Sequence, residues 1–291
     1  MTKLKPLIYA CALTALSGGM THADDIFLDV GTSFNATDAD SRTDDFEKLL
    51  FSVIATSTYT IDDNIFGGDD TTLDTGDKVV DTGHSNIGSL ETNDAAALVG
   101  PALEGFNNDW GLTIDYTISG YAVVGPGGIP DELAAVFTDG TASIFFDDFM
   151  GTETKVLELA LTSSMIEPTN VLLTGIVDYS WCDPACGSFV EDFFNFSDPI
   201  AGEHAFYDIW ALDLTPPISI MWRLDTNIDE AAVVSPEPIS EGSTTWTRET
   251  ELSPTIQFVP EPGTYGAMLL GLGALLFSQR RRMTYALTGE H

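Results

Sequence analysis

The sequence has few basic residues: 11 Lys plus Arg stand against 45 Asp plus Glu in 291 residues, a formal net charge of −34. Lys3, Lys5, Arg280, Arg281 and Arg282 are five of the eleven, so the body between the two ends is more acidic than the whole chain. Such a surface repels phosphate backbones and anionic lipid headgroups, which argues against nucleic-acid binding and polybasic membrane docking. Bound calcium and simple solubility of an exported domain are both compatible with it.

Cysteine and histidine are also scarce, with 3 and 4 copies. Cys11 lies in the amino-terminal segment, which leaves Cys182 and Cys186 in the body. An even pair in an oxidising compartment predicts a local disulfide that closes the turn around Pro184. A zinc site is disfavoured because the pair would supply only two of four ligands.

Residues 1–23 have the pattern of a secretory signal peptide. Lys3 and Lys5 form a basic start, residues 7–16 are apolar, and a small-residue site ends at Ala23, so cleavage is expected between Ala23 and Asp24. The apolar stretch of about ten residues is too short to span a bilayer. We therefore expect export without a permanent amino-terminal anchor.

Residues 258–282 contain three consecutive parts. The motif Pro260-Glu261-Pro262 is followed by an apolar stretch rich in Gly and Ala, and then by Arg280, Arg281 and Arg282. Residues 263–279 would form about 25 Å of helix, just enough to cross a membrane. Because positive residues stay on the cytoplasmic side, we expect the acidic body to face the periplasm.

This three-part order resembles the PEP-CTERM sorting domain of Gram-negative bacteria, whose tail is recognised and cut by exosortase. The resemblance implies transient anchoring in the inner membrane, processing near the PEP motif, and delivery to the cell surface or the extracellular matrix. Sec-type export machinery and exosortase are the expected partners. Residues 283–291 continue past the arginines, a departure from the family pattern, and we expect them to form a short cytoplasmic tail. An ordinary single-pass tail anchor is the alternative.

The body, residues 24–257, has the alternation typical of half-buried strands. In residues 110–119, Trp110, Leu112 and Ile114 lead one apolar face while polar residues and glycine occupy the other. Further strands are expected at 26–34, 49–61, 142–149, 157–162, 171–181, 204–212, 218–225 and 244–252, with helical alternatives at 45–54 and 130–137. Many short strands separated by Gly and Pro predict one all-β domain, an antiparallel β-sandwich or jelly roll.

An acidic segment early in the body is the candidate calcium site. Calcium prefers six to eight oxygen ligands, which closely spaced Asp and Asn with Gly bends can supply. The candidate ligands are Asp62, Asn64, Asp69, Asp70, Asp74, Asp77 and Asp81. The EF-hand pattern does not fit, because a loop begun at Asp62 places Phe66 and Leu73 where oxygen ligands are required. A looser calcium-bound hairpin and solvated acidic turns remain as the two interpretations.

No catalytic residue is predicted. Asp81-Thr82-Gly83 imitates the turn of aspartic proteases, but Asp74-Thr75-Gly76 follows the same pattern too close by to come from an opposing lobe. Residues 83–87 miss the final glycine of a nucleophile elbow, and only His84 and His204 lie in the body. The sequence therefore favours a non-enzymatic protein with no required cofactor.

Three functions are compatible with these features. The first is a structural or adhesive protein of the biofilm or exopolysaccharide matrix. The second is a carbohydrate-binding module, for which Trp181 beside the cysteine pair is the candidate sugar contact, while core packing is expected for most of the phenylalanines after it. The third is a secreted hydrolase, which would need carboxylates or a histidine-based site gathered in one cleft.

Overall fold

A computed structural model of the chain describes residues 25–31, 41–67, 72–92, 95–124, 134–166, 170–184, 186–198, 202–212, 218–225, 237–238 and 244–259. The predicted signal peptide with its cleavage site, the Pro-Glu-Pro motif, the predicted membrane helix and the final tail lie outside these ranges. Within them, no helix has the length and apolar character needed to cross a membrane.

Strands dominate the described chain. The elements are β1 (Asp25–Leu28), β2 (Lys48–Phe51), β3 (Val53–Asn64), β4 (Asp77–Glu91), η1 (Gly100–Leu103), β5 (Gly111–Val123), β6 (Ala134–Asp147), β7 (Glu153–Ile166), β8 (Asn170–Asp178), α2 (Ser188–Glu191), β9 (Phe194–Asp198), β10 (Gly202–Ala205), α3 (Phe206–Ala211), β11 (Ser219–Asp225), β12 (Glu237–Pro238), β13 (Thr245–Leu252) and β14 (Thr255–Val259).

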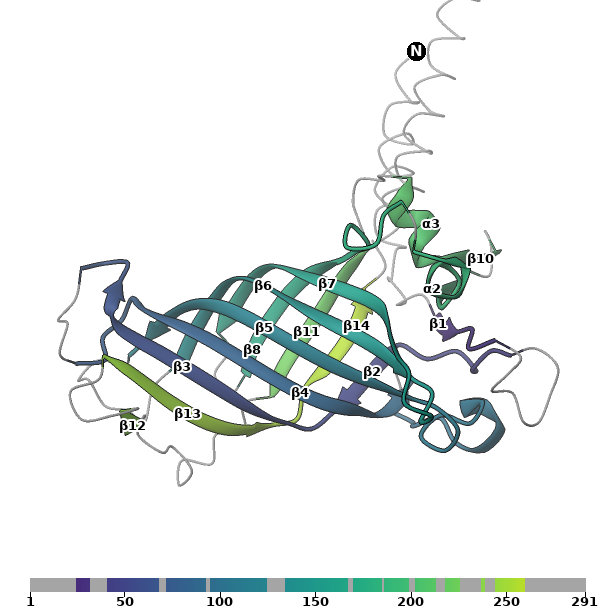
Figure 1. Cartoon of the computed structure of the whole chain (residues 1–291), viewed down its shortest axis with the longest axis horizontal. Helices are drawn as coiled ribbons and strands as arrows, with labels where there is room; N and C mark the ends of the chain where they lie inside the picture. The colour runs from purple at the N-terminus through teal and green to yellow at the C-terminus, as the bar shows by residue number, and fades with distance from the viewer. Residues whose placement is uncertain are drawn as a thin grey trace, which may run out of the picture. The chain divides into compact units, whose positions relative to one another are not determined.

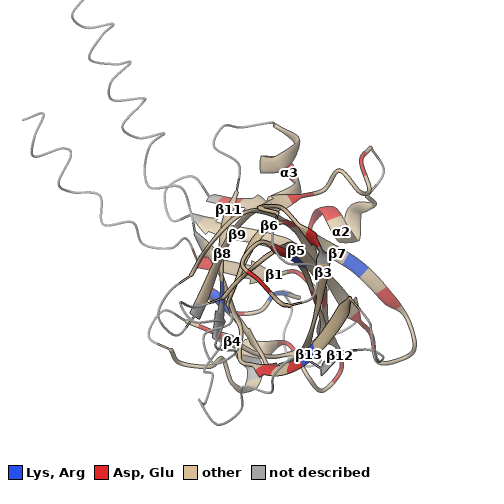
Figure 2. Ribbon diagram, turned by 90° about the vertical axis from the view of Figure 1, so that its left-hand side faces the viewer, with Lys and Arg blue, Asp and Glu red and all other residues tan. Residues whose placement is uncertain are grey.

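The main sheet closes on itself as an eight-stranded antiparallel barrel. Its neighbours run β4-β2-β14-β11-β8-β7-β6-β5, and a β4–β5 pairing closes the ring. The ring is visible end-on in Figure 2 and from the side in Figure 1. After Ser52 the chain of β2 continues as β3, and after Pro254 the chain of β13 continues as β14. β3 and β13 also pair with each other and extend the same wall. Within the ring, each strand from β5 to β7 pairs with the strands before and after it, and β8, β11, β14, β2 and β4 follow in order, an up-and-down arrangement.

The prediction of an all-β antiparallel domain is confirmed, but the finer prediction of a β-sandwich or jelly roll is wrong. Both architectures bury one face of every strand, so both produce the same alternation of apolar and polar residues. What separates them is whether the first and last strands pair, as β2 and β14 do here. That pairing joins the two ends of the body and has no local sequence signature.

Alternation along β5 shows how the sequence fills the barrel. Leu112, Ile114, Tyr116 and Ile118 are almost fully buried, whereas Asp115 and Thr117 between them are exposed. Successive side chains of a strand point to opposite faces, so the apolar set lines the interior. The strand predicted from Trp110 onward is confirmed.

Two local predictions were wrong. Residues 206–211, expected within a strand, form α3, where Tyr207 and Trp210 both contact the ring of Tyr179. Because residues three apart share one face of a helix, this pairing explains the aromatic spacing better than a strand does. The helical alternatives also failed: residues 48–54 belong to β2 and β3, and residues 134–137 begin β6.

The long connection between β8 and β11 covers one end of the barrel. It contains α2, α3 and the strands β9 and β10, which form a second sheet with β1. Aromatic residues from this connection meet residues of the barrel wall. We call the following set the aromatic cap: Trp110, Phe146, Phe189, Phe193, Phe194, Phe196, Phe206 and Phe258, whose rings form a chain of contacts with centroids 4.3–6.4 Å apart.

The phenylalanines predicted to pack in the core do so. Phe193 and Phe194 are fully buried and Phe196 is 7% exposed. Their burial joins the interior of the barrel to the second sheet in one hydrophobic core. One compact unit accordingly extends from Ala23 to Val259.

Candidate functional site

A row of polar side chains crosses the inner wall of the barrel away from the aromatic cap. Arg248 on β13 is paired in register with Ser57 on β3, and Ser57 with Asp81 on β4. Directly paired residues of a sheet point to the same face, and Ser57 and Asp81 are 3% and 5% exposed. We call Arg248, Ser57 and Asp81 the inner polar row.

The carboxyl group of Asp81 is the centre of this row. Ser57 Oγ donates a hydrogen bond of 2.6 Å to Asp81 Oδ2, and the Tyr116 hydroxyl donates one of 2.9 Å to Oδ1. Burial raises the pKa of Asp81, while these two hydrogen bonds and the positive charge of Arg248 oppose that rise. The row thus holds a buried acid whose two oxygens each have one protein donor.

Tyr116 reaches Asp81 across a position without a side chain. Gly83 on β4 pairs with Tyr116 on β5, and a Cβ at Gly83 would lie 2.4 Å from Cε1 of the tyrosine ring. Trp222 on β11 packs edge-on to the same ring, with centroids 5.0 Å apart. Burial raises the pKa of Tyr116, and the nearby Asp81 charge raises it further, so its hydroxyl stays a donor.

Three buried N–H groups of the barrel, one of them in this row, have no hydrogen-bond partner within the described chain. They are Nε1 of Trp222, Nε1 of Trp246 and Nε of Arg248. Trp222 is only 3% exposed, and Trp246 is paired in register with the buried Tyr59, next to the row. A cavity of about 10 Å³, large enough for roughly one water molecule, is lined in part by Trp222.

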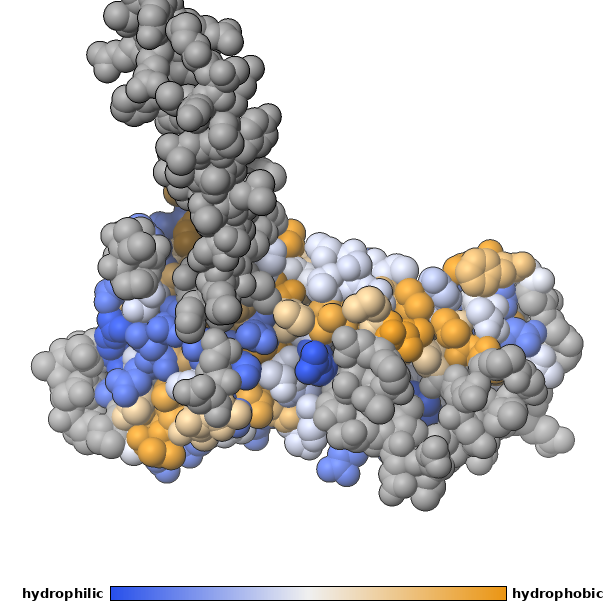
Figure 3. Space-filling model, turned by 180° about the vertical axis from the view of Figure 1, so that it is seen from behind, coloured by the Kyte–Doolittle hydropathy of each residue, from blue (hydrophilic) through white to orange (hydrophobic). Residues whose placement is uncertain are grey.

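A second candidate site lies on the outer wall. A groove of about 300 Å³ crosses β2, β4, β11 and β14, and we call it the outer groove; its lining residues are Lys48, Leu50, Glu91, Met221, Arg223, Thr255 and Gln257. Lys48 is flanked in register by Glu91 and Gln257, and Thr255 by Leu50 and Arg223. The surface thus combines charged, amide and hydroxyl groups with two apolar side chains. Figure 3, which views the molecule from the side opposite to Figure 1, shows a band of hydrophobic residues along this side of the protein.

The structure places the candidate calcium ligands in different surroundings. Asp77 accepts hydrogen bonds from Asn64 Nδ2 at 2.7 Å and from the backbone N–H of Asp74 at 2.6 Å, which ties the β3–β4 hairpin together. Asp81 lies further along β4, inside the barrel. Asp69 and Asp70 lie outside the described residues, as does the side chain of Asp62. Among the described residues, no group of three or more His, Cys, Asp or Glu side chains is gathered as for a metal ion.

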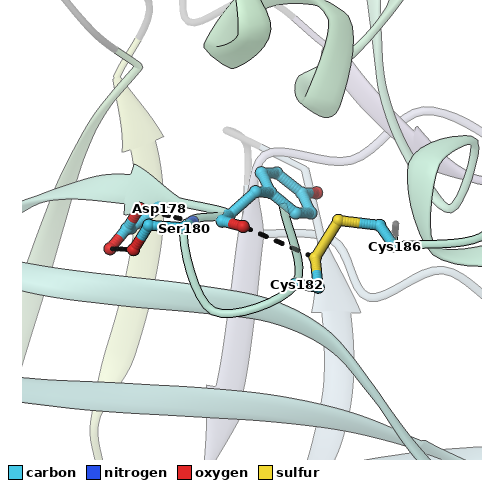
Figure 4. The surroundings of a disulfide bond; sticks show 5 residues. Asp178, Ser180, Cys182 and Cys186 are labelled. Atoms are coloured by element: carbon cyan, nitrogen blue, oxygen red, sulfur yellow. Dashed lines mark hydrogen bonds between the residues drawn. A yellow bond between two sulfur atoms is a disulfide. The ribbon is translucent and has the colours of Figure 1, made fainter. Parts of the chain in front are cut away.

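A disulfide joins Cys182 to Cys186 (Figure 4). The turn before it is held by Asp178, whose carboxylate accepts hydrogen bonds from the backbone N–H and the hydroxyl of Ser180, both at 2.8 Å. The carbonyl of Tyr179 accepts from the N–H of Cys182 at 3.1 Å. The cross-link therefore stabilises the start of the connection that carries the aromatic cap.

Trp181, the candidate sugar contact, is partly buried beside this disulfide. The Nζ of Lys155 lies 4.6 Å from the centroid of its indole ring, and its Nε1 is buried without a hydrogen-bond partner in the described chain. Lys155 in turn forms an ion pair with Glu158. The ring face under Lys155 is thus already occupied by a cation.

The two residues that could have begun a catalytic triad point to opposite faces of β4. His84 forms an ion pair with the exposed Asp115 on the outer surface. Ser85, the next residue along the strand, donates instead to the carbonyl of Ser52. The alternation of the strand thus separates the hydroxyl from the imidazole.

Sequence reasoning found Asp81, as a candidate calcium ligand, but missed its partners Ser57, Tyr116 and Arg248. A weak signal was present, since Trp246, Arg248 and Leu252 follow the same alternation and an arginine at an inward position requires an explanation. Interpreting it requires the strand neighbours, which local pattern does not supply.

Comparison with known proteins gives one match. The family model of the PEP-CTERM protein-sorting motif matches residues 258–282, beginning at the end of β14. No curated protein and no solved structure matches the chain.

Proposed function

We propose that this chain, which carries a PEP-CTERM sorting motif, is exported, targeted to exosortase, and acts without catalysis at the cell surface or in the extracellular matrix, where it associates with exopolysaccharide. The sorting motif implies membrane anchoring through the carboxyl terminus and is the observation that carries the proposal. We propose further that the body faces the periplasm until exosortase releases it, with Sec-type machinery providing export.

The outer groove supports a direct contact with polysaccharide. Its volume of about 300 Å³ is at the lower end of the range for ligand pockets. Arg223 and Gln257 lie on neighbouring strands, and both side-chain types donate hydrogen bonds to sugar oxygens. Leu50 and Met221 offer apolar surface for the C–H faces of a sugar ring. A carbohydrate-binding protein is therefore the form of the matrix role that the outer groove favours.

Processing is tested by the mass and location of the exported protein. Mass spectrometry of the extracellular fraction should show a chain that has lost the residues after Pro262. Glu261→Ala should leave full-length protein in the membrane fraction, while the matched control Glu251→Ala, an exposed strand residue, should be processed normally. Full-length wild-type protein outside the cell would contradict processing by exosortase.

Polysaccharide contact is tested by affinity electrophoresis through gels that contain polysaccharides of the producing cell. Wild-type protein should be retarded, and Arg223→Ala with Gln257→Ala should migrate faster. Arg42→Ala is the matched control, because Arg42 is paired with Asp45 and Glu203 outside the outer groove. Trp181→Ala tests the second contact predicted from the sequence. Normal migration of the wild type in every gel would overturn the polysaccharide proposal and leave the processing result intact.

A further inference from the structure

A pocket on the outer wall lies beside the β3–β4 hairpin, at the end of the barrel away from α2 and α3 (Figure 1). Its volume is about 260 Å³, and we call it the hairpin pocket; its lining includes Asp63, Lys78, Ser119, Gly120, Tyr121 and Thr138. Lys78 and Glu91 of the outer groove lie at opposite ends of β4, roughly 40 Å apart at about 3.3 Å per residue. The hairpin pocket is therefore separate from the outer groove.

Strand pairing places the side chains of the hairpin pocket on one face. Lys78 on β4 is paired in register with Tyr121 on β5, and directly paired residues point to the same face. Ser119, two residues before Tyr121, shares that face because side chains alternate along a strand. Asp63 Oδ2 lies 3.7 Å from Lys78 Nζ, so β3 contributes a carboxylate to the same place.

A β-bulge adds one more side chain to this face. The register between β5 and β6 shifts after Ser119, which leaves Thr138 unpaired between the partners of Ser119 and Gly120. Such an extra residue redirects a side chain of the bulged strand. A Cβ at Gly120 would lie 1.9 Å from the carbonyl oxygen of Val136, so this close approach of the two strands requires glycine. The sequence thus builds the bulge that brings Thr138 to the pocket.

The hairpin pocket is held in place by contacts of its own. The backbone N–H of Val124, at the end of β5, donates a hydrogen bond of 2.9 Å to Thr75 Oγ1 in the β3–β4 connection. Phe66 packs against the ring of Tyr121, with centroids 5.5 Å apart and planes at 78°. Both contacts tie the hairpin to β5, so a ligand would meet a site that is already formed. Binding to a preformed site costs less ordering of side chains and loops.

The chemistry of the hairpin pocket suits a sugar. The Asp63 carboxylate only accepts hydrogen bonds, the Lys78 ammonium only donates them, and the hydroxyls of Ser119 and Thr138 do both. Sugar hydroxyls also donate and accept, and the C–H face of a sugar ring is apolar surface that packs on an aromatic side chain. We propose that the hairpin pocket binds one neutral sugar ring, packed on Tyr121 and hydrogen-bonded to the ion pair and the two hydroxyls.

The ion pair favours a neutral ligand. The side chains of Asp63 and Lys78 are 62% and 50% exposed, so both remain accessible to hydroxyl groups. An ionised ligand would be attracted by one member of the pair and repelled by the other. That the sugar ring belongs to a polysaccharide rests on the proposed function. With the outer groove at the other end of β4, the protein then holds two polysaccharide segments at once.

The test is a titration followed through the backbone amide signals of the ¹⁵N-labelled full-length chain in a detergent without sugar groups. Maltotriose, cellotriose and mannotriose are the probes, and glycerol at equal hydroxyl concentration is the control. At least one trisaccharide should produce saturable shifts of the Ser119, Tyr121 and Thr138 signals. No such shift with any of the three, or equal shifts with glycerol, would overturn the inference. Shifts confined to Thr255 and Gln257 would also overturn it while supporting the outer groove, and shifts confined to the hairpin pocket would support it whatever the outer groove binds.

Three variants connect the shifts to the pocket. Tyr121→Ala removes the packing surface and should weaken binding about tenfold, and Thr138→Ala removes one hydrogen bond and should weaken it about threefold. Thr117→Ala is the matched control, because Thr117 is an exposed threonine of β5 that does not line the pocket, and its affinity should equal that of the wild type. Equal affinities of Thr138→Ala and Thr117→Ala would contradict the proposed contact. The wild-type titration and Thr138→Ala decide the question even if Tyr121→Ala does not fold.

Discussion

The two ends of the barrel interior are lined by strands with the same alternation, but their inward side chains differ in polarity. At one end the inward residues meet the aromatic cap, where rings such as Phe193, Phe194 and Phe206 pack against one another with no polar atoms. Further along the same walls the inward positions hold Ser57, Asp81 and Arg248. The difference shows that an alternating pattern determines which residues face the interior, but not whether that interior is apolar throughout or contains hydrogen-bonding groups.

The cost of burial also differs between these regions. Removing apolar rings from water stabilises the capped end without any requirement for partners. In the inner polar row each buried group must be hydrogen-bonded or it destabilises the fold, and Arg248 Nε there is unpartnered within the described chain. We therefore regard the aromatic cap as the region that stabilises the fold and the inner polar row as the region where burial must be offset by hydrogen bonds.

The largest expected effect comes from Phe194→Ala in the aromatic cap. Phe194 is fully buried, with ring centroids of Phe193, Phe206 and Phe258 at 5.4, 5.6 and 5.9 Å. Truncation should lower the free energy of unfolding by about 4 kcal/mol, since it removes buried area and leaves a cavity. Urea unfolding measures this value.

The matched control is Phe66→Ala at the opposite end of the barrel. Phe66 is 65% exposed and touches only the edge of one ring, that of Tyr121, among the aromatic contacts of the described chain. Its loss should cost less than about 1 kcal/mol. Similar costs for the two variants would break the distinction between a stabilising cap and the rest of the barrel.

The second prediction concerns Asp81. Asp81→Ala leaves the hydroxyls of Ser57 and Tyr116 without their acceptor and removes the nearest opposing charge from Arg248, so it should cost about 3 kcal/mol in urea unfolding. Asp81→Asn keeps one acceptor oxygen and should cost less. Asp115→Ala, which removes an exposed acid from the neighbouring strand, is the control and should stay below about 1 kcal/mol. If Asp81→Ala costs no more than the control, the inner polar row is not an interdependent buried network.

The sequence predicted the elements of this fold better than their arrangement. Alternation in residues 110–119 was enough to find β5, because one strand carries that signal by itself. Closure of the barrel depends on β2 meeting β14 from the other end of the body, and sandwiches show the same alternation. The short helix α3 was missed because aromatic spacing in six residues fits a strand until the contacts with Tyr179 are known.

The candidate site was harder to predict for the same reason. Ser57 and Asp81 are 24 residues apart, and Tyr116 reaches them only because Gly83 leaves space for its ring. In sequence, Asp81 resembles the other acidic residues of a polar segment, and that likeness groups it with Asp77 as a calcium ligand. Position along β4 separates their roles: Asp77 holds the hairpin, while Asp81 lies further along the interior.

The smallest expected effect is the dependence of stability on pH that Asp81 contributes. Burial raises the pKa of Asp81 above its ordinary value of 3.8, so between that value and the raised pKa the folded protein retains a proton that the unfolded chain releases. Stability should therefore fall as pH rises through this window, and the loss is complete above the raised pKa. Burial also raises the pKa values of Tyr59 and Tyr116, the tyrosines that face Asp81, so neither ionises there.

The measurement is the difference between the urea-unfolding stabilities of the wild type and Asp81→Asn across this pH range, because the subtraction cancels the other carboxylates. The difference should decline as pH increases, by about 1.4 kcal/mol for every pH unit that separates the folded and unfolded pKa values of Asp81. A difference that rises with pH would mean that Ser57, Tyr116 and Arg248 favour the ionised acid more than burial opposes it.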